Sequence, residues 1–201
     1  MTKSSSEGWQ TYYDATASRP PRATLLCALA GFTAPGTAAD LGCGDGRDTI
    51  ELLRCGWTVL AIDDEPQAIE RLRARPEAVE AAAAGRLSVQ CRRFEKADWP
   101  AVDLINASFA LPLCPPDRFP RLWERIAGSL RPGGCFAGQF YGDRDGWAGR
   151  PGITCLDRAA ALRLLDGFIL ERFDEEENDA VTPRGRPKHW HVFHIVARLR
   201  A

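Results

Sequence analysis

The residues with the clearest chemical meaning are the glycines and acids of residues 39–48, which read Ala-Asp-Leu-Gly-Cys-Gly-Asp-Gly-Arg-Asp. Gly42, Gly44 and Gly46 alternate with other residues between a short apolar segment and an amphipathic one. Glycines at this spacing let a backbone turn tightly around a ligand, because side chains there would collide with it. The helix that follows would present unpaired N–H groups at the same place. The spacing therefore predicts a ligand-binding turn between a strand and a helix.

The nearest alternative is a dinucleotide-binding turn, whose pattern G-x-G-x-x-G needs a third glycine for close helix–strand packing. Arg47 stands at that third place, and a large cation suits such packing poorly. Asp40 would also face an incoming pyrophosphate. A cofactor with an amino group and a sulfonium but no phosphate suits an acidic strand end better, so these residues favour that kind of ligand.

A second acidic signal ends the apolar run at residues 59–62, where Asp63, Asp64 and Glu65 precede Pro66. It lies about twenty residues beyond the first turn, the distance that one strand–turn–helix–strand passage needs before an acid can reach a bound ribose. The same acids could instead cap a helix that starts near Pro66. We expect both, with Asp63 on the ribose and its neighbours on the helix.

These two motifs resemble those of class I S-adenosylmethionine-dependent methyltransferases, and residues 130–134, Leu-Arg-Pro-Gly-Gly, resemble the L-x-P-G-G turn before their fifth strand. The resemblance is to small single-domain enzymes, including the tellurite-resistance and thiopurine types, and covers roughly the whole chain after Arg22. It implies S-adenosylmethionine as cofactor, S-adenosylhomocysteine as product, and in-line methyl transfer to a small acceptor through oxygen, nitrogen or sulfur. The alternatives are a non-catalytic binder of the cofactor and an RNA or protein methyltransferase.

Strand-like and helix-like segments alternate along the chain, which favours a parallel sheet covered on both faces. The predicted strands are Thr37–Leu41, Trp57–Ile62, Leu87–Cys91, Val102–Ala107, Cys135–Tyr141, Phe168–Phe173 and His191–Ala197. The predicted helices are Arg47–Arg54, Pro66–Ala74, Pro116–Leu130 and Leu156–Leu165, and the alanines of Ala81–Gly85 also read as helix. The resemblance adds an antiparallel C-terminal hairpin with a long charged connection. The expected α/β fold is thus a Rossmann-like, seven-stranded, mostly parallel sheet with helices on both faces.

Ligands of open α/β sheets bind beyond the carboxyl ends of the strands, which selects the candidate cofactor site. The resemblance suggests Phe94 against the adenine, although ordinary core packing explains that side chain equally well, and Glu95 at the adenine amino edge. Residues after the fourth strand would surround the methionine moiety. The full predicted set is Arg19, Asp40, Gly42, Cys43, Gly44, Gly46, Arg47, Asp63, Asp64, Phe94, Glu95, Asn106, Ser108 and Phe109.

The acceptor side is predicted to contain Tyr13, Ser108, Arg144, Trp147, Lys188, His189 and His191. Strand alternation places His189 and His191 on one face and His194 on the other. A hydroxyl or amine acceptor needs a base, for which His189 or His191 has the most suitable pKa. An anionic acceptor needs none, and Arg144, Arg186 or Lys188 could attract it. The loop that holds Arg144 and Trp147 could equally be a solvated loop whose charges pair with each other.

Segment 1–22 is predicted either as a lid over the cofactor or as a packed extension, with Arg19 meeting the cofactor's carboxylate in the first case. The 201 residues, 45% of them hydrophobic, predict one domain, with 23–201 as its core. A net charge of −1 disfavours a nucleic-acid partner. Seven cysteines without a C-x-x-C pair indicate reduced thiols and no metal site. No signal or membrane-spanning segment is apparent, so we expect a cytoplasmic monomer or homodimer.

Overall fold

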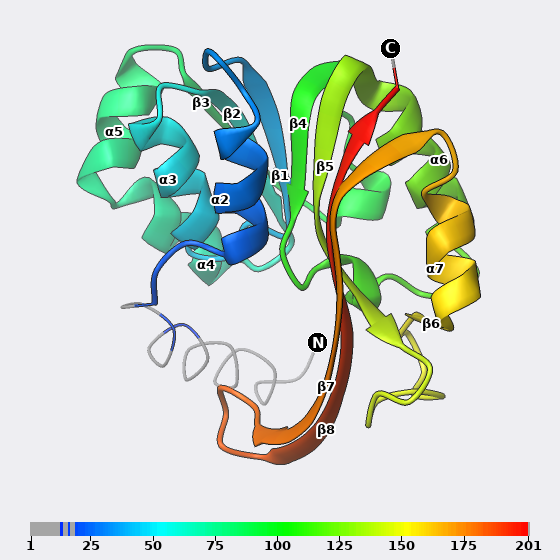
Figure 1. Ribbon diagram of the computed structural model, residues 1–201. Helices are drawn as coiled ribbons and strands as arrows, with labels where there is room; N and C mark the ends of the chain where they lie inside the picture. Colours follow the sequence, from blue (N-terminus) through cyan, green and yellow to red (C-terminus); the bar gives the residue numbers. More distant parts are fainter. Residues whose placement is uncertain (1–12, 14–15, 17–18, 201) are drawn as a thin grey trace.

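A twisted sheet runs through the computed structural model, which describes residues 13, 16 and 19–200, and helices cover both of its faces (Figure 1). The strands are β1 (Thr37–Leu41), β2 (Thr58–Asp63), β3 (Leu87–Cys91), β4 (Val102–Ala107), β5 (Leu130–Gly142), β6 (Cys155–Leu156), β7 (Phe168–Val181) and β8 (Pro187–Leu199). The helices are α2 (Ala23–Ala30), α3 (Arg47–Arg54), α4 (Pro66–Arg73), α5 (Pro76–Ala83), α6 (Phe119–Ser129) and α7 (Arg158–Leu164), with 3₁₀ turns η1 (Phe94–Lys96) and η2 (Leu111–Leu113).

The strand order across the sheet is β3-β2-β1-β4-β5-β8-β7, and the short β6 pairs with β5. Strands β1 to β5 are mutually parallel, whereas β8 runs antiparallel to both β5 and β7. The strand order reverses between β1 and β4, so the connections that follow these two strands lead in opposite directions along the sheet. The carboxyl ends of β1 and β4 therefore border the crevice in which such sheets bind ligands.

Two hydrophobic clusters, one on each face of the sheet, make the core. Helices α2 to α5 cover one face, where Leu25, Ile50 and Leu72 are buried. Helices α6 and α7 cover the other, where Trp123 stacks edge-on against Phe136 and Phe140 with ring centroids 5.0 and 5.4 Å apart. Each large side chain buried in this way contributes about 1.5–3 kcal/mol to folding. The core therefore makes the sheet a rigid base for the loops at its carboxyl edge.

The predicted fold class is confirmed, with differences in the length and number of elements. Helix α2 was not predicted, α5 starts at Pro76 where the predicted helical segment began at Ala81, and β6 adds a short eighth strand within the described residues. The larger difference is the hairpin, because β7 continues to Val181 and β8 starts at Pro187 where a long loop was predicted. Cross-strand pairing of opposite charges, such as Asp179 opposite His189, stabilises strand structure in this polar stretch.

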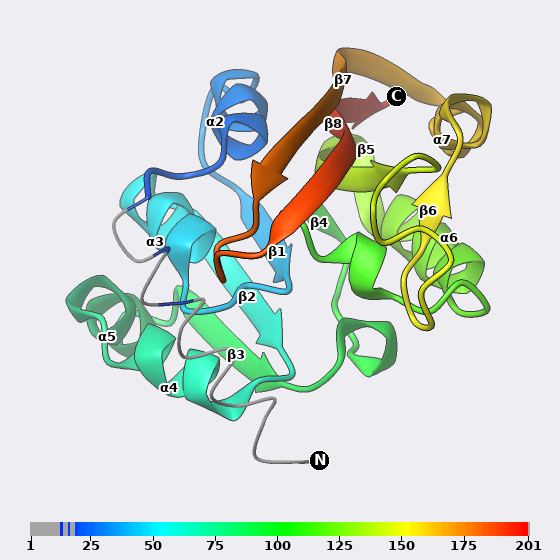
Figure 2. The ribbon, with the colours of Figure 1, turned by 90° about the horizontal axis from the view of Figure 1, so that it is seen from below.

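The long hairpin extends past the edge of the sheet at which β1 and β4 end (Figures 1 and 2). Its β8 strand faces β5 through pairs that include Phe140–Phe193 and Tyr141–Val192. Directly beyond them, Gly142 lies against the imidazole of His191, and a methyl group at this glycine would overlap the ring. The end of β5 thus approaches β8 more closely than any residue with a side chain would allow.

We expect Gly142→Ala to lower the free energy of unfolding by about 1–3 kcal/mol, because the new methyl group must displace the buried ring of His191. Urea denaturation measures this change. The matched control is Gly128→Ala on α6, where nothing lies within 4 Å of the added methyl group. That change should stabilise the protein by about 0.5–1 kcal/mol, the usual gain for glycine to alanine in a helix. Equal effects at both sites would contradict the packing described for Gly142.

Candidate functional site

The glycine turn between β1 and α3 is held directly against the end of β2. The backbone N–H groups of Gly42 and Cys43 donate to the carbonyl oxygen of Ile62 at 2.8 and 3.0 Å. Gly42 has φ +73°, and a Cβ at this residue would lie 2.5 Å from Cβ of Ala110. Only glycine fits both the left-handed backbone and this close approach. Gly46, also left-handed at φ +91°, precedes the first turn of α3.

Asp63 at the end of β2 connects the glycine turn to α4. Its Oδ2 accepts a hydrogen bond from Gly44 N at 2.8 Å and its Oδ1 accepts one from Glu65 N at 2.9 Å. Burial raises the pKa of this carboxyl group, and the two backbone donors partly offset the rise. Glu65 caps α4 as predicted, accepting a hydrogen bond from Gln67 N. Asp64 points outward, 3.5 Å from Arg93. A ribose contact by Asp63 stays a prediction.

Beneath the turn lies a buried network of two carboxyl groups. Asp40 is 1% exposed and accepts hydrogen bonds from Thr49 Oγ1 at 2.6 Å and Asn106 Nδ2 at 2.8 Å. The same amide nitrogen lies 3.2 Å from Asp48 Oδ2, and Asp48 also accepts from Arg22 N at 2.9 Å. Burial, followed by the charge of Asp48, raises the pKa of Asp40 to about 7. Asp40 and Asn106 thus support the turn from inside the fold.

The segment that leads into α2 is anchored to the start of α3. Arg47, predicted as a cofactor contact, donates from Nε to the carbonyl oxygen of Pro20 at 2.6 Å. Arg19 is exposed. The buried ring of Tyr13 lies over the glycine turn, with Cε1 3.3 Å from the position that a Cβ of Gly44 would take. Most of the predicted lid, residues 1–12, 14, 15, 17 and 18, lies outside the described residues.

Phe94 and Glu95, in the 3₁₀ turn after β3, lie on the side of the glycine turn where the adenine was predicted. Phe94 Cε1 is 4.0 Å from the position that a Cβ of Gly42 would take. The Glu95 side chain is 4% exposed, and its Oε1 pairs with Arg93 and Arg118. Its Oε2 is buried and has no hydrogen-bond partner among the residues the structure describes. A buried acceptor without a donor is costly, which suits a site that a ligand N–H completes.

Across the crevice, Phe109 follows β4 in a strained backbone conformation with φ +55°. Its N–H donates to Gln139 Oε1 at 2.9 Å, and the buried Gln139 in turn donates to Thr24 Oγ1 at 3.0 Å. The Phe109 ring centroid lies 6.4 Å from that of Tyr141 and 6.2 Å from that of Trp190. We call these three rings, Phe109, Tyr141 and Trp190, the aromatic wall. Ser108 lies beside it, its hydroxyl 3.3 Å from Asn106 Oδ1.

Lys188 is not available to attract an anionic acceptor, contrary to the prediction. Its side chain is 1% exposed and pairs with the fully buried Asp145, Nζ to Oδ2, at 2.9 Å. Burial lowers the pKa of Lys188, and the hydrogen bond that its ammonium donates to Asp145 opposes that effect. Trp147, predicted on the acceptor side, contacts Lys188 and lies 6.0 Å from the Tyr141 ring.

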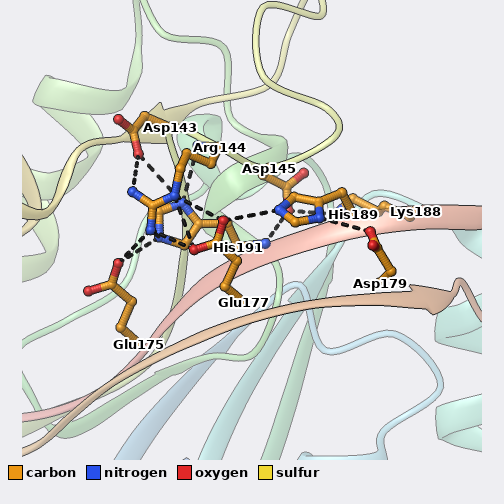
Figure 3. A network of polar contacts seen from close by, with 9 residues as sticks. All are labelled: Asp143, Arg144, Asp145, Glu175, Glu177, Asp179, Lys188, His189 and His191. Carbon is orange, nitrogen blue, oxygen red and sulfur yellow. Dashed lines mark hydrogen bonds and ion pairs between the residues drawn. The ribbon is translucent and has the colours of Figure 1, made fainter.

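His189 and His191 also differ from their predicted role, because they lie on the opposite face of β8 from the aromatic wall. The imidazole of His191 is fully buried, with Nδ1 accepting from Arg144 N at 3.1 Å and Nε2 2.9 Å from Glu175 (Figure 3). Hydrogen bonds to Asp179 and Glu177 raise the pKa of His189, which opposes its use as a base at neutral pH.

Arg144 belongs to the same charged network and makes a two-point contact with Glu177 (Figure 3). The alternative considered for this loop, charges that pair with each other, therefore describes Arg144. His194 lies on the wall's face instead, with its ring 6.1 Å from Phe109 and its Nε2 2.9 Å from Glu176 Oε2.

The sequence alone did not identify several residues of this site, namely Asp48, Thr49, Gln139, Asp145, Glu176, Trp190 and His194. Strand alternation could have placed Trp190 with Lys188 and His194, since all three have even numbers on one strand. Over the described part of the chain, no group of three or more histidine, cysteine or acidic side chains is placed to hold a metal ion. Within the same residues, no helix has the length and apolar character needed to cross a membrane.

Comparison with known proteins gives a family match over part of the chain. Residues 38–134, which contain the glycine turn, Asp63, Glu95 and Phe109, match a family described as a methyltransferase domain. Among curated proteins, none matches the sequence significantly.

Solved structures of low sequence identity share the fold. TehB from Haemophilus influenzae superposes with a TM-score of 0.77 at 15% identity, covering 94% of this chain but only 66% of that one. A 1,6-didemethyltoxoflavin-N1-methyltransferase from Burkholderia thailandensis, with 1,6-didemethyltoxoflavin and S-adenosylhomocysteine bound, gives 0.65 at 21% identity, covering 96% and 85%. Magnesium protoporphyrin IX methyltransferase from Synechocystis PCC 6803, with S-adenosylhomocysteine bound, gives 0.67 at 14%, covering 97% and 95%.

The buried Asp40 should make the stability of the protein depend on pH. Its pKa is about 7 in the folded chain and about 4 in the unfolded chain, so the folded chain binds more protons between these values. The free energy of unfolding should therefore fall as pH rises from about 4 to about 7, by up to ~1.4 kcal/mol per pH unit, and level off above. Urea denaturation across this range measures the slope.

Asp40→Asn should reduce this slope, since the group that takes up the proton is gone. Asp166→Asn, an exposed aspartate after α7, is the control and should leave it unchanged. An undiminished slope in Asp40→Asn would assign the pH dependence to other carboxyl groups.

Proposed function

We propose that the chain is a class I methyltransferase, as the match of residues 38–134 to a methyltransferase domain supports, and that it transfers the methyl group of S-adenosylmethionine to a small-molecule acceptor. The accepting atom is an oxygen, nitrogen or sulfur nucleophile. The observation that carries the proposal is the buried Glu95 Oε2, which has no hydrogen-bond partner among the described residues. It lies beside Phe94, whose ring is near a glycine turn that tolerates no side chain at Gly42.

The residues at the carboxyl edge suit this cofactor chemically. Glu95 Oε2 offers an acceptor to an amino group such as that of adenine, with the Phe94 ring beside it. Asp63 would exchange its contact with Gly44 N for hydroxyl groups of the ribose. Asp48, together with Asp40 where the pH exceeds its pKa of about 7, places negative charge below the turn, which favours a positively charged ligand there. No phosphate-binding role fits these four acids.

S-adenosylmethionine, when bound, supplies a methyl group on a positively charged sulfonium, which leaves as a neutral thioether. The protein's own contribution is then to hold the acceptor in line and to exclude water. Phe109 and Trp190 are half-buried on the side of the crevice opposite Glu95, and Gln139 fixes the backbone of Phe109. These residues would position a small acceptor.

An acceptor that carries a proton also needs a base, and we assign this role to His194 with Glu176 as the carboxylate that orients it. His194 is the histidine on the face of the aromatic wall, 6.1 Å from the Phe109 ring. A neutral imidazole accepts a proton efficiently near pH 7, whereas an anionic acceptor such as a thiolate needs no base.

S-adenosylmethionine and S-adenosylhomocysteine should bind with micromolar affinity, and NAD(H) should not. Calorimetry with all three ligands measures this. Asp63→Ala should weaken cofactor binding by about 1–3 kcal/mol, because the ribose hydroxyls lose their acceptor. Asp166→Ala, at an exposed site after α7, is the matched control and should bind as the wild type does. Tight NAD binding without any response to S-adenosylhomocysteine would overturn the cofactor assignment.

Incubating the protein with S-adenosylmethionine labelled in its methyl group and a panel of phenols, amines and thiols identifies the acceptor. With a phenol or amine acceptor, His194→Gln should lower kcat about a hundredfold without changing the affinity for S-adenosylhomocysteine. His189→Gln is the control on the opposite face and should change kcat little. The base assignment fails if the two variants behave alike. Cofactor binding without methylation of any acceptor would indicate a non-catalytic binder.

A further inference from the structure

The ammonium group of Lys188 lies inside a cage of aromatic rings. Its Nζ is 3.5 Å from the ring centroid of Trp190, 4.0 Å from that of Tyr141 and 4.1 Å from that of Trp147. Cation–π contacts of this kind strengthen when the cation is removed from water, as it is here. The three rings thus form a binding site for an ammonium group, and the protein's own Lys188 fills it. We call Tyr141, Trp147, Trp190 and Asp145 the lysine cage.

Asp145 completes the cage and ties it to two segments of the chain. Besides Lys188, it accepts hydrogen bonds from Trp147 N at 2.9 Å and from His191 N at 3.2 Å. Next to it, Gly146 N donates to the carbonyl oxygen of His189 at 2.8 Å. Burying an ion pair is costly unless its remaining hydrogen-bonding capacity is used, and here the carboxylate accepts two backbone hydrogen bonds besides the one from Lys188. The pair therefore fastens the loop after β5 onto β8.

Two rings of the lysine cage also belong to the aromatic wall. Tyr141 and Trp190 contact Lys188 and at the same time lie 6.4 and 6.2 Å from Phe109, ring centroid to ring centroid. Phe109 and Trp190 remain half-buried, whereas Lys188 is enclosed behind them. Phe109 meets Trp190 edge-on, with an interplanar angle of 89°, and the guanidinium of Arg22 lies over the Phe109 ring, 4.4 Å from its centroid.

We propose that Lys188 is a positioning residue: its ammonium, paired with Asp145, orients Tyr141 and Trp190 so that the aromatic wall receives a planar acceptor. The inference rests on the proposed function, because it concerns the acceptor side of the same site. Lys188 itself touches no ligand. A planar, unsaturated molecule gains from stacked or edge-to-face contact with such rings, whereas a saturated molecule of the same size gains only from burial.

The test compares 2-naphthol with its saturated counterpart decahydro-2-naphthol, which differ in planarity while sharing a hydroxyl group and a ten-carbon frame. Calorimetry measures the affinity of each in the presence of saturating S-adenosylhomocysteine. The variant is the double substitution Lys188→Met with Asp145→Asn, which removes both charges and so avoids leaving a buried charge unpaired. Arg163→Met, which removes an exposed cation on α7, is the control.

The wild type and the control should prefer 2-naphthol by about tenfold or more, a difference of ~1.4 kcal/mol. The double variant should fold and bind S-adenosylhomocysteine normally but lose most of this preference, with a changed near-ultraviolet circular dichroism spectrum as its indole rings reorient. A preference that persists in the folded double variant would overturn the positioning role.

Two other outcomes, both measured on the wild type, are distinguishable from a persisting preference in the double variant. The absence of any preference in the wild type would overturn the planar acceptor class. Failure of the wild type to bind S-adenosylhomocysteine would instead overturn the proposed function on which this inference rests. If the double variant does not fold, Lys188→Arg, which keeps the charge, provides the second measurement. Retained preference there supports the role of the cation, and its loss in a folded protein contradicts it.

Discussion

The burial of Asp40 is the constraint on which the candidate site depends. A carboxyl group at the end of a central strand loses its hydration, and it is tolerated only because Thr49 and Asn106 donate to it and its pKa rises. These two donors come from α3 and β4, so satisfying one acid fixes a helix and a strand relative to β1. Asp48 joins the same network and carries it to the backbone of Arg22. The glycine turn is therefore supported from beneath by polar contacts.

The two halves of the crevice use different kinds of interaction. On the side of β2 and β3, backbone donors and carboxylates dominate, which suits a ligand with many polar atoms. On the side of β4, β5 and β8, aromatic rings dominate, and the polar groups Gln139 and Asp145 act inside the protein to hold backbone segments. Shape and hydrophobic contact would then select the acceptor, whereas hydrogen bonds would select the cofactor.

The extended hairpin separates its charged and aromatic side chains onto opposite faces. His189 and His191 join Arg144, Glu175 and Glu177 on one face (Figure 3). Trp190 and His194 lie on the other, beside Phe109. Because neighbouring residues of a strand point to opposite sides, one short segment supplies both sets. The charged face pairs with the loop after β5, and this pairing keeps the hairpin extended beyond the sheet.

The glycine turn, the acids after β1 and β2, and most strands and helices could be predicted from the sequence, because glycine conformation, capping and periodicity act between residues close in the chain. Alternation also showed that His189 and His191 share a face. Which face of β8 meets Phe109 depends on the register of β5 with β8 and on the twist of the hairpin, which are set by contacts between distant segments. For the same reason the sequence did not reveal that Lys188 pairs with Asp145, which lies 43 positions away, and Lys188 was predicted to be available to an anionic acceptor. Its burial, like the partners of Asp40, was decided only when the tertiary structure brought those segments together.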